Sequence, residues 1–570
     1  MSHERLISVE NLGIGFRHEG EVRPAVLNST FSVFAGETLA IVGESGSGKS
    51  VSSLSLMKLL QKGKVVFTSG RFILHHSLFP GSSKEHEIEP TDAILEKLRG
   101  RSIAMIFQEP MTSLNPVMTC GEQVEEILIK HLRIPREKAR LRALSLFEEV
   151  KLPRAESMLD SYPHQLSGGQ RQRVMIAMAI ACEPKLLIAD EPTTALDVTV
   201  QHEILALLKQ LQQKRGMGMI FITHDLGVVE EIADDILVMK KGQIVEYGKA
   251  IDVLQRPTHE YTRGLLQCRP RASSKNLRLL TVRDFEQNAH PTASLREEKS
   301  IGDAVFLNVD NLSKTYQSTS LFNKKAAIVQ AVDNVSFQIR KGETLGLVGE
   351  SGCGKTTLSR MLLGLIPATT GKIEYTLGNE ATRDIVTLSA SDLRNIRKEI
   401  QIIFQDPYSA LNPKHTIAFA LTEPMLVHGI GGSNAERRNL AFELLEKVGL
   451  IPEHIDRYPH EFSGGQRQRI VIARALACRP SFIICDESVS ALDVSVQAQV
   501  LNLLNDLKSE FGLTYLFISH DLRVVHYMSD RIMVMNKGKI EEIGSANQVF
   551  YAPQSAYTQR LLSAIPGKER

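Results

Sequence analysis

Two runs of glycine, lysine and hydroxyl residues have the spacing of a loop that binds phosphate groups. The pattern G-x-x-x-x-G-K-[ST] runs from Gly43 to Ser50 and again from Gly349 to Thr356. In such a loop, successive backbone N–H groups point into one concavity at a helix N-terminus, the lysine reaches the β- and γ-phosphates, and the hydroxyl binds Mg²⁺. Nucleotide contacts are therefore expected from Gly43, Ser45, Gly46, Ser47, Gly48, Lys49 and Ser50, and from Gly349, Ser351, Gly352, Cys353, Gly354, Lys355 and Thr356.

An acidic pair follows a short apolar run in each half of the chain. Asp190-Glu191 ends the run 186–189, and Asp486-Glu487 ends the run 482–485. An aspartate at the end of a buried strand can hold the Mg²⁺ that the loop hydroxyl also binds. The carboxylate that follows can orient and deprotonate an attacking water. The predicted chemistry is hydrolysis of ATP, with Glu191 and Glu487 as the catalytic bases.

The whole set of motifs occurs twice, in the same order and at a constant distance. Asp190 and Asp486 are 296 residues apart, and the same distance separates His224 from His520. Repetition at a fixed period indicates one architecture present twice. A chain of 570 residues is long enough for two such modules, each with its own core.

Composition restricts the class of protein. The hydrophobic share of 43% and the charged share of 23% are typical of a soluble globular protein. No apolar run approaches the roughly 18 residues of a spanning helix, and the N-terminus has no apolar signal region, so a cytoplasmic location is expected. A net charge of +2 gives no basic field of the kind that nucleic-acid binding uses, which disfavours RNA and DNA as partners.

The six cysteines show neither a C-x-x-C spacing nor the density of a disulfide scaffold, so we interpret them as buried small residues rather than metal ligands. Cys353 is the exception. It lies inside the second phosphate loop, beside Lys355 and a helix N-terminus, where the pKa of a thiol tends to fall. A maleimide is therefore expected to modify Cys353 faster than the other five thiols, and MgATP is expected to protect it.

Strands alternate with helices in each half. The apolar segments 38–42 and 344–348 lead into the phosphate loops, helices are expected over 50–60 and 356–365, and 219–223 and 515–519 are predicted to be buried parallel strands. This alternation predicts a parallel sheet covered on both faces. Alternating patterns at 6–16 and 305–316 predict earlier strands. Helical patterns between 108 and 167, including 120–132 and 135–150, predict a small helical subdomain, which 405–463 mirrors.

Two polar stretches are interpreted as surface. Residues 268–303 lack clear apolar periodicity and are predicted to form a solvated linker. The stretch 75–90 makes the first half longer than the second, and we interpret His75, His76 and His86 within it as loop surface rather than metal ligands.

A further signature precedes each acidic pair: Ser167-Gly168-Gly169-Gln170 in the first half and Ser463-Gly464-Gly465-Gln466 in the second. Together with the phosphate loops, it resembles the ATP-binding cassette (ABC) family over nearly the whole chain. The resemblance implies that the signature of one half caps the nucleotide bound by the other, so that the halves form an intramolecular pseudo-dimer around two ATP molecules. Each Ser-Gly-Gly opens a helical pattern whose N-terminal amides would meet a γ-phosphate.

The resemblance also assigns roles to single residues. It implies one site from Lys49, Ser50, Gln108, Asp190, Glu191 and His224 with Ser463 and Gly465. It implies a second site from Lys355, Thr356, Gln405, Asp486, Glu487 and His520 with Ser167 and Gly169. Gln108 and Gln405 join the Mg²⁺ ligands, and the two histidines contact the γ-phosphate. Loops containing Asp197 and Asp493 communicate between the sites, and Phe16 and Tyr316 either stack on adenine or belong to the core. Ser488, where the first half has Pro192, is expected to tune hydrolysis without abolishing it.

Segments 108–116 and 405–413, and the half-ends 257–266 and 553–562, resemble the paired ATPase subunits of bacterial dipeptide and oligopeptide importers. The fused arrangement resembles the ATPases of microcin C-type and glutathione-type importers. It implies a translocase on the cytoplasmic face of the inner membrane, with two permease subunits and a substrate-binding protein as partners and no direct contact with the substrate. Some relatives carry several cysteines after the first extension that hold an iron–sulfur cluster. Here only Cys268 is present, so no cluster is expected.

Two alternatives stay open, a nickel importer and a soluble tandem ABC ATPase that acts on ribosomes or DNA. The predicted fold is α/β, with two tandem ABC-type P-loop domains at 1–267 and 304–570 and a linker at 268–303. Each domain is expected to have a RecA-like parallel-sheet core, an antiparallel β subdomain, a helical subdomain and a C-terminal extension.

Overall fold

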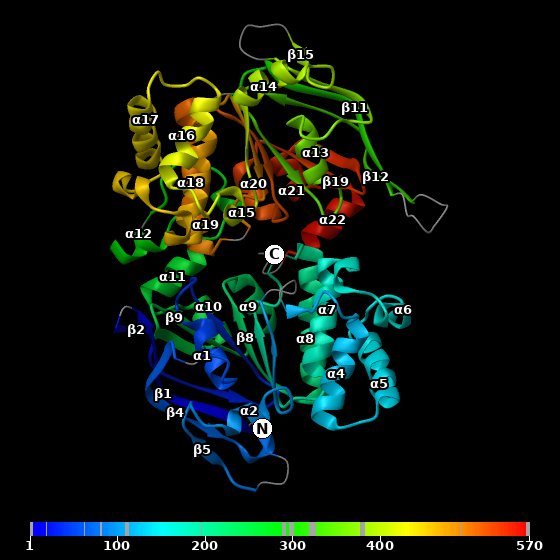
Figure 1. The fold of residues 1–570 in the computed structure, drawn as a ribbon, viewed down its shortest axis with the longest axis vertical. Helices are drawn as coiled ribbons and strands as arrows, with labels where there is room; N and C mark the ends of the chain where they lie inside the picture. The colour runs from blue at the N-terminus through cyan, green and yellow to red at the C-terminus, as the bar shows by residue number, and fades with distance from the viewer. Residues whose placement is uncertain are drawn as a thin grey trace.

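The computed structural model contains two cassettes that lie head to tail along the longest axis of the molecule (Figure 1). It describes residues 4–18, 20–61, 63–79, 83–108, 113–194, 196–287, 292–295, 301–318, 327–376, 382–490 and 492–565. The two helical subdomains lie on opposite sides in this view, with α4 and α5 at the right and α16 and α17 at the left. The second cassette is therefore turned relative to the first, as a pseudo-dimer requires.

Each cassette contains one antiparallel and one mainly parallel sheet. The antiparallel sheet of cassette 1 has the order β2-β1-β4-β5, with β1 (Arg5–His18), β2 (Glu21–Phe34), β4 (Val65–Leu74) and β5 (His86–Ile88). Its six-stranded sheet has the order β10-β9-β3-β8-β7-β6, with β3 (Thr38–Val42), β6 (Ile103–Ile106), β7 (Leu186–Asp190), β8 (Gly218–Thr223), β9 (Asp235–Lys240) and β10 (Gln243–Lys249). Only β10 in this sheet is antiparallel to its neighbour.

Cassette 2 repeats both sheets. Its antiparallel sheet has the order β12-β11-β14-β15, with β11 (Val305–Ser318), β12 (Ala327–Arg340), β14 (Thr370–Tyr375) and β15 (Arg383–Asp384). Its six-stranded sheet has the order β16-β17-β18-β13-β19-β20, with β13 (Thr344–Val348), β16 (Ile400–Ile403), β17 (Phe482–Asp486), β18 (Thr514–Ile518), β19 (Arg531–Asn536) and β20 (Lys539–Ser545). All residues of β3, β7, β13 and β17 are buried, which explains their continuous apolar runs.

Helices cover these sheets and form the subdomains. In cassette 1 they are α1 (Lys49–Leu56), α2 (Ile94–Leu98), α4 (Cys120–Leu132), α5 (Arg136–Glu149), α6 (Ala155–Leu159), α7 (Gly168–Ile180), α8 (Val198–Arg215), α9 (Leu226–Ile232), α10 (Ala250–Gln255) and α11 (Glu260–Gln267). A further helix, α12 (Val282–Gln287), follows. In cassette 2 they are α13 (Lys355–Leu362), α14 (Ala390–Glu399), α15 (Pro407–Ala410), α16 (Ile417–Val427), α17 (Asn434–Lys447), α18 (Gly464–Leu476), α19 (Val494–Phe511), α20 (Leu522–Met528), α21 (Ala546–Tyr551) and α22 (Ala556–Ser563).

The predicted α/β fold is confirmed in each of its parts: a mainly parallel core sheet, an antiparallel sheet and a helical subdomain. The strongest local signals were found where expected. The helix predicted over 120–132 is α4, which begins at a capping box formed by Thr119 and Glu122. None of the described helices is both long and apolar enough to cross a membrane.

The segment after α11 is not the solvated linker that the sequence predicted. We call residues 268–287 the connector; in it Cys268, Leu279, Val282 and Phe285 are all buried. Cys268, Leu279 and Val282 join a hydrophobic cluster that continues into cassette 2. Figure 1 shows α11 and α12 between the two cassettes, close to α19. The polar composition misled the prediction because a few apolar side chains are enough to dock a short segment.

Asn502 fastens the connector to cassette 2. The N–H of Leu279 donates to Oδ1 of Asn502 (3.1 Å), and Nδ2 of Asn502 donates to the carbonyl of Leu279 (2.8 Å). The hydroxyl of Tyr527 donates to the carbonyl of Leu277 (3.0 Å). The position that corresponds to Asn502 in cassette 1 is Ala206, so the asparagine serves the connector rather than the cassette fold.

Asn502→Ala, which installs the residue of cassette 1, is expected to release the connector. It leaves the buried N–H and C=O of Leu279 without partners, which costs about 1 to 3 kcal/mol. Hydrogen exchange of the amides at 277–287 should therefore accelerate, while exchange in β17 and β18 stays unchanged. The matched control is Asp506→Ala, which removes only the half-exposed ion pair with Arg278 and should have little effect. Equal exchange in parent and Asn502→Ala would contradict this role.

Candidate functional site

Both phosphate loops have the backbone geometry that the sequence motif requires. Gly43 and Gly48 have φ angles of 153° and 102°, and a Cβ on Gly43 would lie 2.2 Å from the carbonyl oxygen of Met239. Each lysine turns back over its loop. Nζ of Lys49 donates to the carbonyls of Gly43 and Glu44 (2.6 and 2.8 Å), and Lys355 makes the equivalent pair of bonds.

Two other parts of the chain bind each loop from outside. The N–H of Glu44 donates to the hydroxyl of Tyr261 on α11 (3.1 Å), and the N–H of Ser45 donates to Oδ2 of Asp493 in the other cassette (3.0 Å). Ser495 also donates to Glu44 across the interface. The second loop repeats this arrangement, where Glu350 N–H meets Tyr557 (3.2 Å) and Ser351 N–H meets Asp197 (3.3 Å).

These hydrogen bonds join residues that the sequence analysis assigned to the sites without predicting which of them touch. Asp197 and Asp493 were expected to communicate between sites, and each contacts the phosphate loop of the opposite cassette. The predicted face-to-face arrangement is thus present at these loops. Tyr261 and Tyr557 were missed as part of the site, although they lie 296 residues apart and the repeat could have revealed them.

The buried aspartate lies next to the loop hydroxyl in cassette 1. Oγ of Ser50 donates to Oδ1 of Asp190 (3.1 Å) at the end of β7. Burial raises the pKa of Asp190 to about 6, although the bond from Ser50 opposes this. In cassette 2 the contact to Asp486 comes instead from Ser359 (3.5 Å), and burial likewise raises the pKa of Asp486. A buried carboxylate beside a hydroxyl is a donor set that suits Mg²⁺.

Glu191, the predicted catalytic base, forms a compact cluster with the predicted histidine and glutamine. Oε1 of Glu191 lies 3.3 Å from Nδ1 of His224, and Nε2 of Gln108 donates to Oε2 of Glu191 (3.0 Å). The hydroxyl of Thr194 also donates to Oε2 (2.9 Å), a contact that the sequence did not predict.

Electrostatics favour the ionised pair. Burial disfavours both charges, but the histidine lowers the pKa of Glu191 to about 2 and the glutamate raises the pKa of His224. Glu191 is therefore a carboxylate at neutral pH and can accept a proton.

Cassette 2 repeats this cluster with one difference. Glu487 lies 3.5 Å from Nδ1 of His520 and accepts from Gln405 (2.7 Å). Ser490, which corresponds to Thr194, donates to the backbone carbonyl of Glu487 rather than to the carboxylate (2.9 Å). Burial opposes ionisation here too, but His520 lowers the pKa of Glu487. Glu487 is thus held by fewer side chains than Glu191.

Both of these glutamates have left-handed backbones, with φ angles of 46° for Glu191 and 47° for Glu487. Residues other than glycine rarely adopt this conformation, and it costs of order 1 kcal/mol or more. The N–H of each glutamate donates to the end of the neighbouring strand, at Ile222 and Ile518. This hydrogen bond stabilises the turn that orients the glutamate carboxylate toward its histidine.

Each signature segment opens a helix at the interface. The hydroxyl of Ser167 accepts from the N–H of Gln170, whose side chain accepts from the N–H of Ser167, so the signature forms a capping box. Ser463 and Gln466 form the same box at the start of α18. A Cβ on Gly169 would lie 2.6 Å from Val200 on α8, which explains the glycine. Contact of the signature with a nucleotide in the opposite loop stays a prediction.

The remaining expected contacts have mixed outcomes. Phe16 is half-buried on β1, and Tyr316 is 41% exposed with Lys314 over its ring; stacking of either on adenine stays a prediction. Residues 109–112 and 195, which include part of the first importer-like segment, lie outside the described residues.

A cation that the sequence did not predict also lies at the site. Arg269 of the connector forms an ion pair with Asp225 (2.8 Å), next to His224.

The expectation for Cys353 was wrong. Its side chain is only 5% exposed beneath the loop, where a Cβ on Gly349 would lie 2.7 Å from its sulfur. Burial raises the pKa of the Cys353 thiol, and the nearby Lys355 offsets only part of this. Desolvation therefore outweighs the charge and helix effects on which the prediction relied. Cys268, the cysteine of the connector, is also buried.

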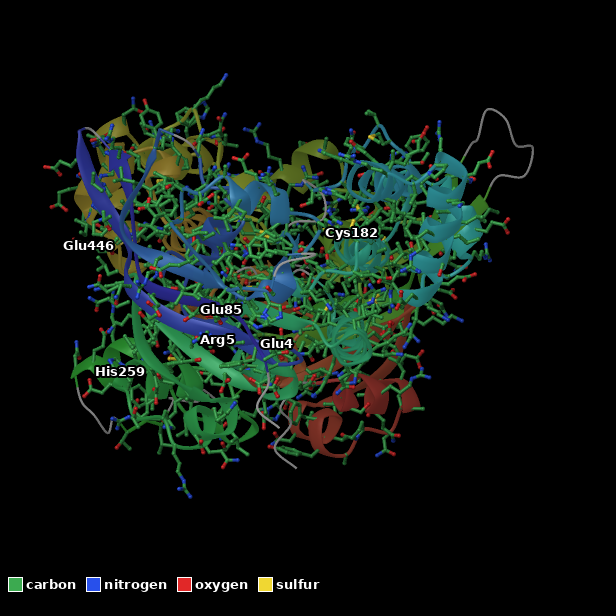
Figure 2. All side chains as sticks on the ribbon, turned by 90° about the horizontal axis from the view of Figure 1, so that it is seen from below. Glu4, Arg5, Glu85, Cys182, His259 and Glu446 are labelled. Atoms are coloured by element: carbon green, nitrogen blue, oxygen red, sulfur yellow. The ribbon has the colours of Figure 1, made fainter. Side chains whose placement is uncertain are left out.

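The histidines of the first antiparallel sheet serve local structure. Nδ1 of His75 lies 2.6 Å from Oε1 of Glu4 and accepts from the N–H of Ser77, so it caps the short turn at 76–78. Glu4, His75 and His76 place one ligand atom each within 4.8 Å of one another. Figure 2 shows Glu4 near the edge of this sheet, beside the Arg5–Glu85 ion pair.

Comparison with known proteins gives consistent matches. The family model "ABC transporter" matches residues 26–194 and 332–490, and "Oligopeptide/dipeptide transporter, C-terminal region" matches 245–293. The second match extends from the end of cassette 1 through the connector.

Curated relatives include the glutathione import ATP-binding protein GsiA of Escherichia coli (strain K12), which is 48% identical over 99% of this chain and 90% of the relative. The protein of the same name from Salmonella typhimurium (strain LT2) is 48% identical over 98% of this chain and 89% of the relative. A solved dimeric cassette, MJ0796 with ADP and Pi, is 30% identical over 42% of this chain and 98% of its own, with a TM-score of 0.38.

Thiol labelling of the native protein should follow the burial observed here. Five cysteines are buried and Cys182 alone is partly exposed. A maleimide is therefore expected to label Cys182 first, with Cys353 at least tenfold slower because its loop must open. Peptide mapping against time measures both rates, and the Cys182→Ser variant identifies the fast site. Fast labelling of Cys353 that MgATP suppresses would contradict this order and restore the expectation from sequence.

Proposed function

This chain belongs to the ABC transporter family, and we propose that it is the ATPase of a peptide importer, with glutathione or a similar short peptide as cargo. The observation that carries the proposal is the continuous similarity to glutathione import ATP-binding proteins, 48% over 99% of the chain. The match to the oligopeptide/dipeptide transporter C-terminal region supports the same cargo class. The duplicated cassettes supply the two nucleotide-binding halves that such an ATPase needs.

The enzyme hydrolyses ATP, and we propose that the two glutamate clusters supply the groups that do so. Glu191 is an ionised carboxylate aimed by a strained turn and held by His224 and Gln108. It orients the attacking water and accepts its proton. Glu191 raises the pKa of His224 against the effect of burial, which favours the protonated ring that would supply positive charge for the γ-phosphate. Glu487, Gln405 and His520 perform these steps in the other cassette.

Mg²⁺ fits the residues present. Asp190 is a buried carboxylate whose ionisation burial opposes, and a divalent cation would remove that penalty. Ser50 and Asp190 would hold the ion in one site, Thr356 and Asp486 in the other, with Gln108 and Gln405 alongside. Bound Mg²⁺ would neutralise charge on the β- and γ-phosphates.

Coupling between the sites follows from the contacts across the interface. Asp493 holds the N–H of Ser45, and Asp197 holds the N–H of Ser351. A nucleotide bound in either loop changes the hydrogen-bond partners of those amides. Nucleotide binding at one site therefore changes a contact with the opposite cassette. In the proposed cycle, ATP closes the cassettes and the signatures at Ser463 and Ser167 cap the two nucleotides. Two permease subunits on the cytoplasmic face of the inner membrane follow that motion.

Delivery of cargo by a substrate-binding protein completes the proposal, in which this chain never touches the peptide. A nickel importer is the alternative. The similarity to glutathione import ATP-binding proteins favours glutathione. No observation on the described residues favours action on ribosomes or DNA.

Replacing the catalytic carboxylates should stop turnover without stopping binding. Glu191→Gln and Glu487→Gln keep the hydrogen bonds but lose the base, so each should lower ATP hydrolysis, and the double variant should lower it about 100-fold or more. Binding of a fluorescent ATP analogue should be unchanged. Glu230→Gln, at an exposed carboxylate of cassette 1, is the matched control. Parental hydrolysis in the double variant would remove both glutamates from the mechanism.

Transport by a deletion strain tests the cargo. Loss of the gene should abolish accumulation of labelled glutathione or short peptides, because the permeases would lack their ATPase. The parental gene should restore uptake, and a gene carrying Lys49→Ala with Lys355→Ala should not, since both phosphate loops lose their lysine. Normal peptide uptake with defective nickel uptake would select the alternative cargo. A ribosome or DNA-repair defect with normal uptake of both would overturn the importer.

A further inference from the structure

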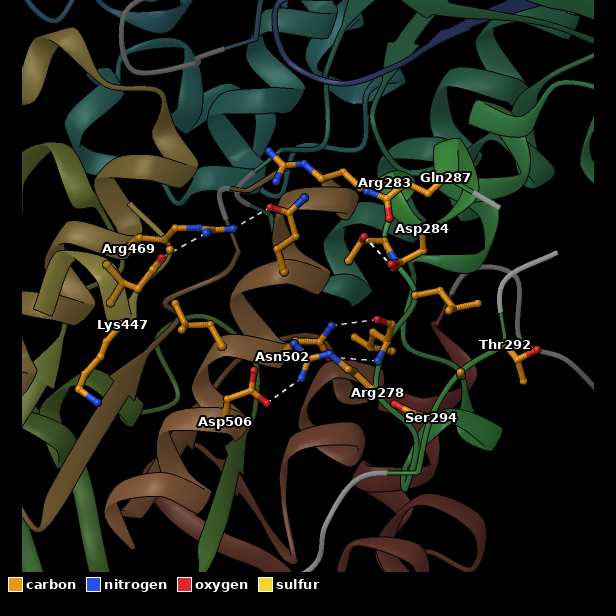
Figure 3. A pocket seen from close by; sticks show the side chains of 18 of the residues that line it. Arg278, Arg283, Asp284, Gln287, Thr292, Ser294, Lys447, Arg469, Asn502 and Asp506 are labelled. Atoms are coloured by element: carbon orange, nitrogen blue, oxygen red, sulfur yellow. Dashed lines mark hydrogen bonds and ion pairs between the residues drawn. The ribbon is translucent and has the colours of Figure 1, made fainter. Parts of the chain in front are cut away.

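A cavity of about 500 Å³ lies between the connector and cassette 2 (Figure 3). The connector contributes residues 278–281 and helix α12, residues 292–294 also line the cavity, and cassette 2 contributes α18, α19 and the end of α17. The cavity lies away from both phosphate loops and takes no part in the hydrolysis described above.

One arginine in this cavity has lost the carboxylate that its counterpart keeps. In cassette 1, Arg173 on α7 donates to the carbonyl of Val150 (2.8 Å) and forms an ion pair with Glu203 (2.6 Å). The corresponding Arg469 on α18 donates to the carbonyl of Val448 (3.1 Å) and to Oε1 of Gln499 (2.7 Å). Gln499 occupies the position of Glu203. The backbone contact is preserved, but the neutral amide leaves the charge of Arg469 uncompensated.

The connector adds a second cation. Figure 3 shows Arg283 of α12 pointing across the cavity toward Arg469. Burial and the charge of Arg283 both lower the pKa of Arg469, so the two guanidinium groups repel. Among the described residues, no carboxylate forms an ion pair with either of them. Two like charges facing one cavity are unfavourable unless an anion lies between them.

Two of the three carboxylates that line the cavity are held by other groups. Asp506 pairs with Arg278 (2.7 Å), and Asp284 accepts from the N–H and hydroxyl of Thr281 (2.6 and 2.8 Å). Glu446 is exposed, on the last turn of α17. The lysine beside it, Lys447, pairs with Glu510 outside the cavity. The local excess of positive charge is therefore confined to Arg283 and Arg469.

We propose that this cavity binds a small anion bearing a phosphate or carboxylate group between Arg283 and Arg469. The anion supplies the negative charge that Glu203 provides in cassette 1. Guanidinium groups match both oxyanions in geometry and bind them through paired N–H donors. Because Arg469 is on the helix that begins at the signature Ser463, the ligand joins the connector to the signature helix. The proposal depends on neither the cargo nor the permeases.

Calorimetric titration of the full-length protein with inorganic phosphate tests this site, with saturating MgADP present to occupy the phosphate loops. Gln499→Glu rebuilds the ion pair of cassette 1, and Arg283→Gln removes an exposed cation that has no ion pair. Both should weaken phosphate binding about tenfold or more, the effect of losing one charge-assisted contact. Glu203→Gln is the matched control in cassette 1, whose Arg173 does not line this cavity, and should bind as the parent does.

A parallel titration with succinate distinguishes a carboxylate ligand from a phosphate ligand. Weakening by Gln499→Glu and Arg283→Gln in either titration, with Glu203→Gln unaffected, supports the site. Absence of binding by the parent in both titrations would overturn it, as would equal affinities in all four proteins. Equal weakening by the control would also overturn it, because the effect would then not depend on this cavity.

Discussion

The backbone N–H groups of the phosphate loops are the groups on which the rest of the structure depends. A loop that presents several amides to a phosphate has amides that no helix or sheet satisfies. Here Tyr261 of the C-terminal extension takes the N–H of Glu44, and Asp493 of the opposite cassette takes that of Ser45. Each loop is therefore built from three parts of the chain. A conformational change in one loop therefore alters its contacts with both the C-terminal extension of its own cassette and the partner cassette.

The loop amides take a partner from the opposite cassette, which explains why the two cassettes lie in one fixed orientation relative to each other. Asp493 can reach Ser45, and Asp197 can reach Ser351, only when the cassettes face each other head to tail. The same arrangement places Ser495 against Glu44. Covalent connection makes this encounter intramolecular and raises the effective concentration of one cassette near the other.

Sequence reasoning succeeded where chemistry and local structure coincide. A phosphate loop needs a strand before it and a helix after it, and an acidic pair needs the end of a buried strand, so the motifs also located β3, α1 and β7. It failed where the burial of a side chain or a segment determines its properties. Cys353 was judged by its charged neighbours, yet it lies beneath the loop with 5% of its surface exposed. The connector was judged by composition, yet Asn502 and Tyr527 on distant helices fasten it. Tyr261 lay within a recognised segment, but only the fold shows that its hydroxyl meets the loop.

The two cassettes differ where a single connector has to pack against one of them. A duplicated architecture has two equivalent surfaces, but the connector can dock on only one. Along that surface Asn502 replaces Ala206 and Gln499 replaces Glu203. The first change gives the connector its hydrogen bonds, and the second removes a carboxylate opposite Arg283. The predicted catalytic residues keep their types in both cassettes, although Ser490 replaces Thr194 beside Glu487. The two substitutions that face the connector lie on α19, the helix that follows Asp493, and they act on the connector backbone and on Arg469 of α18.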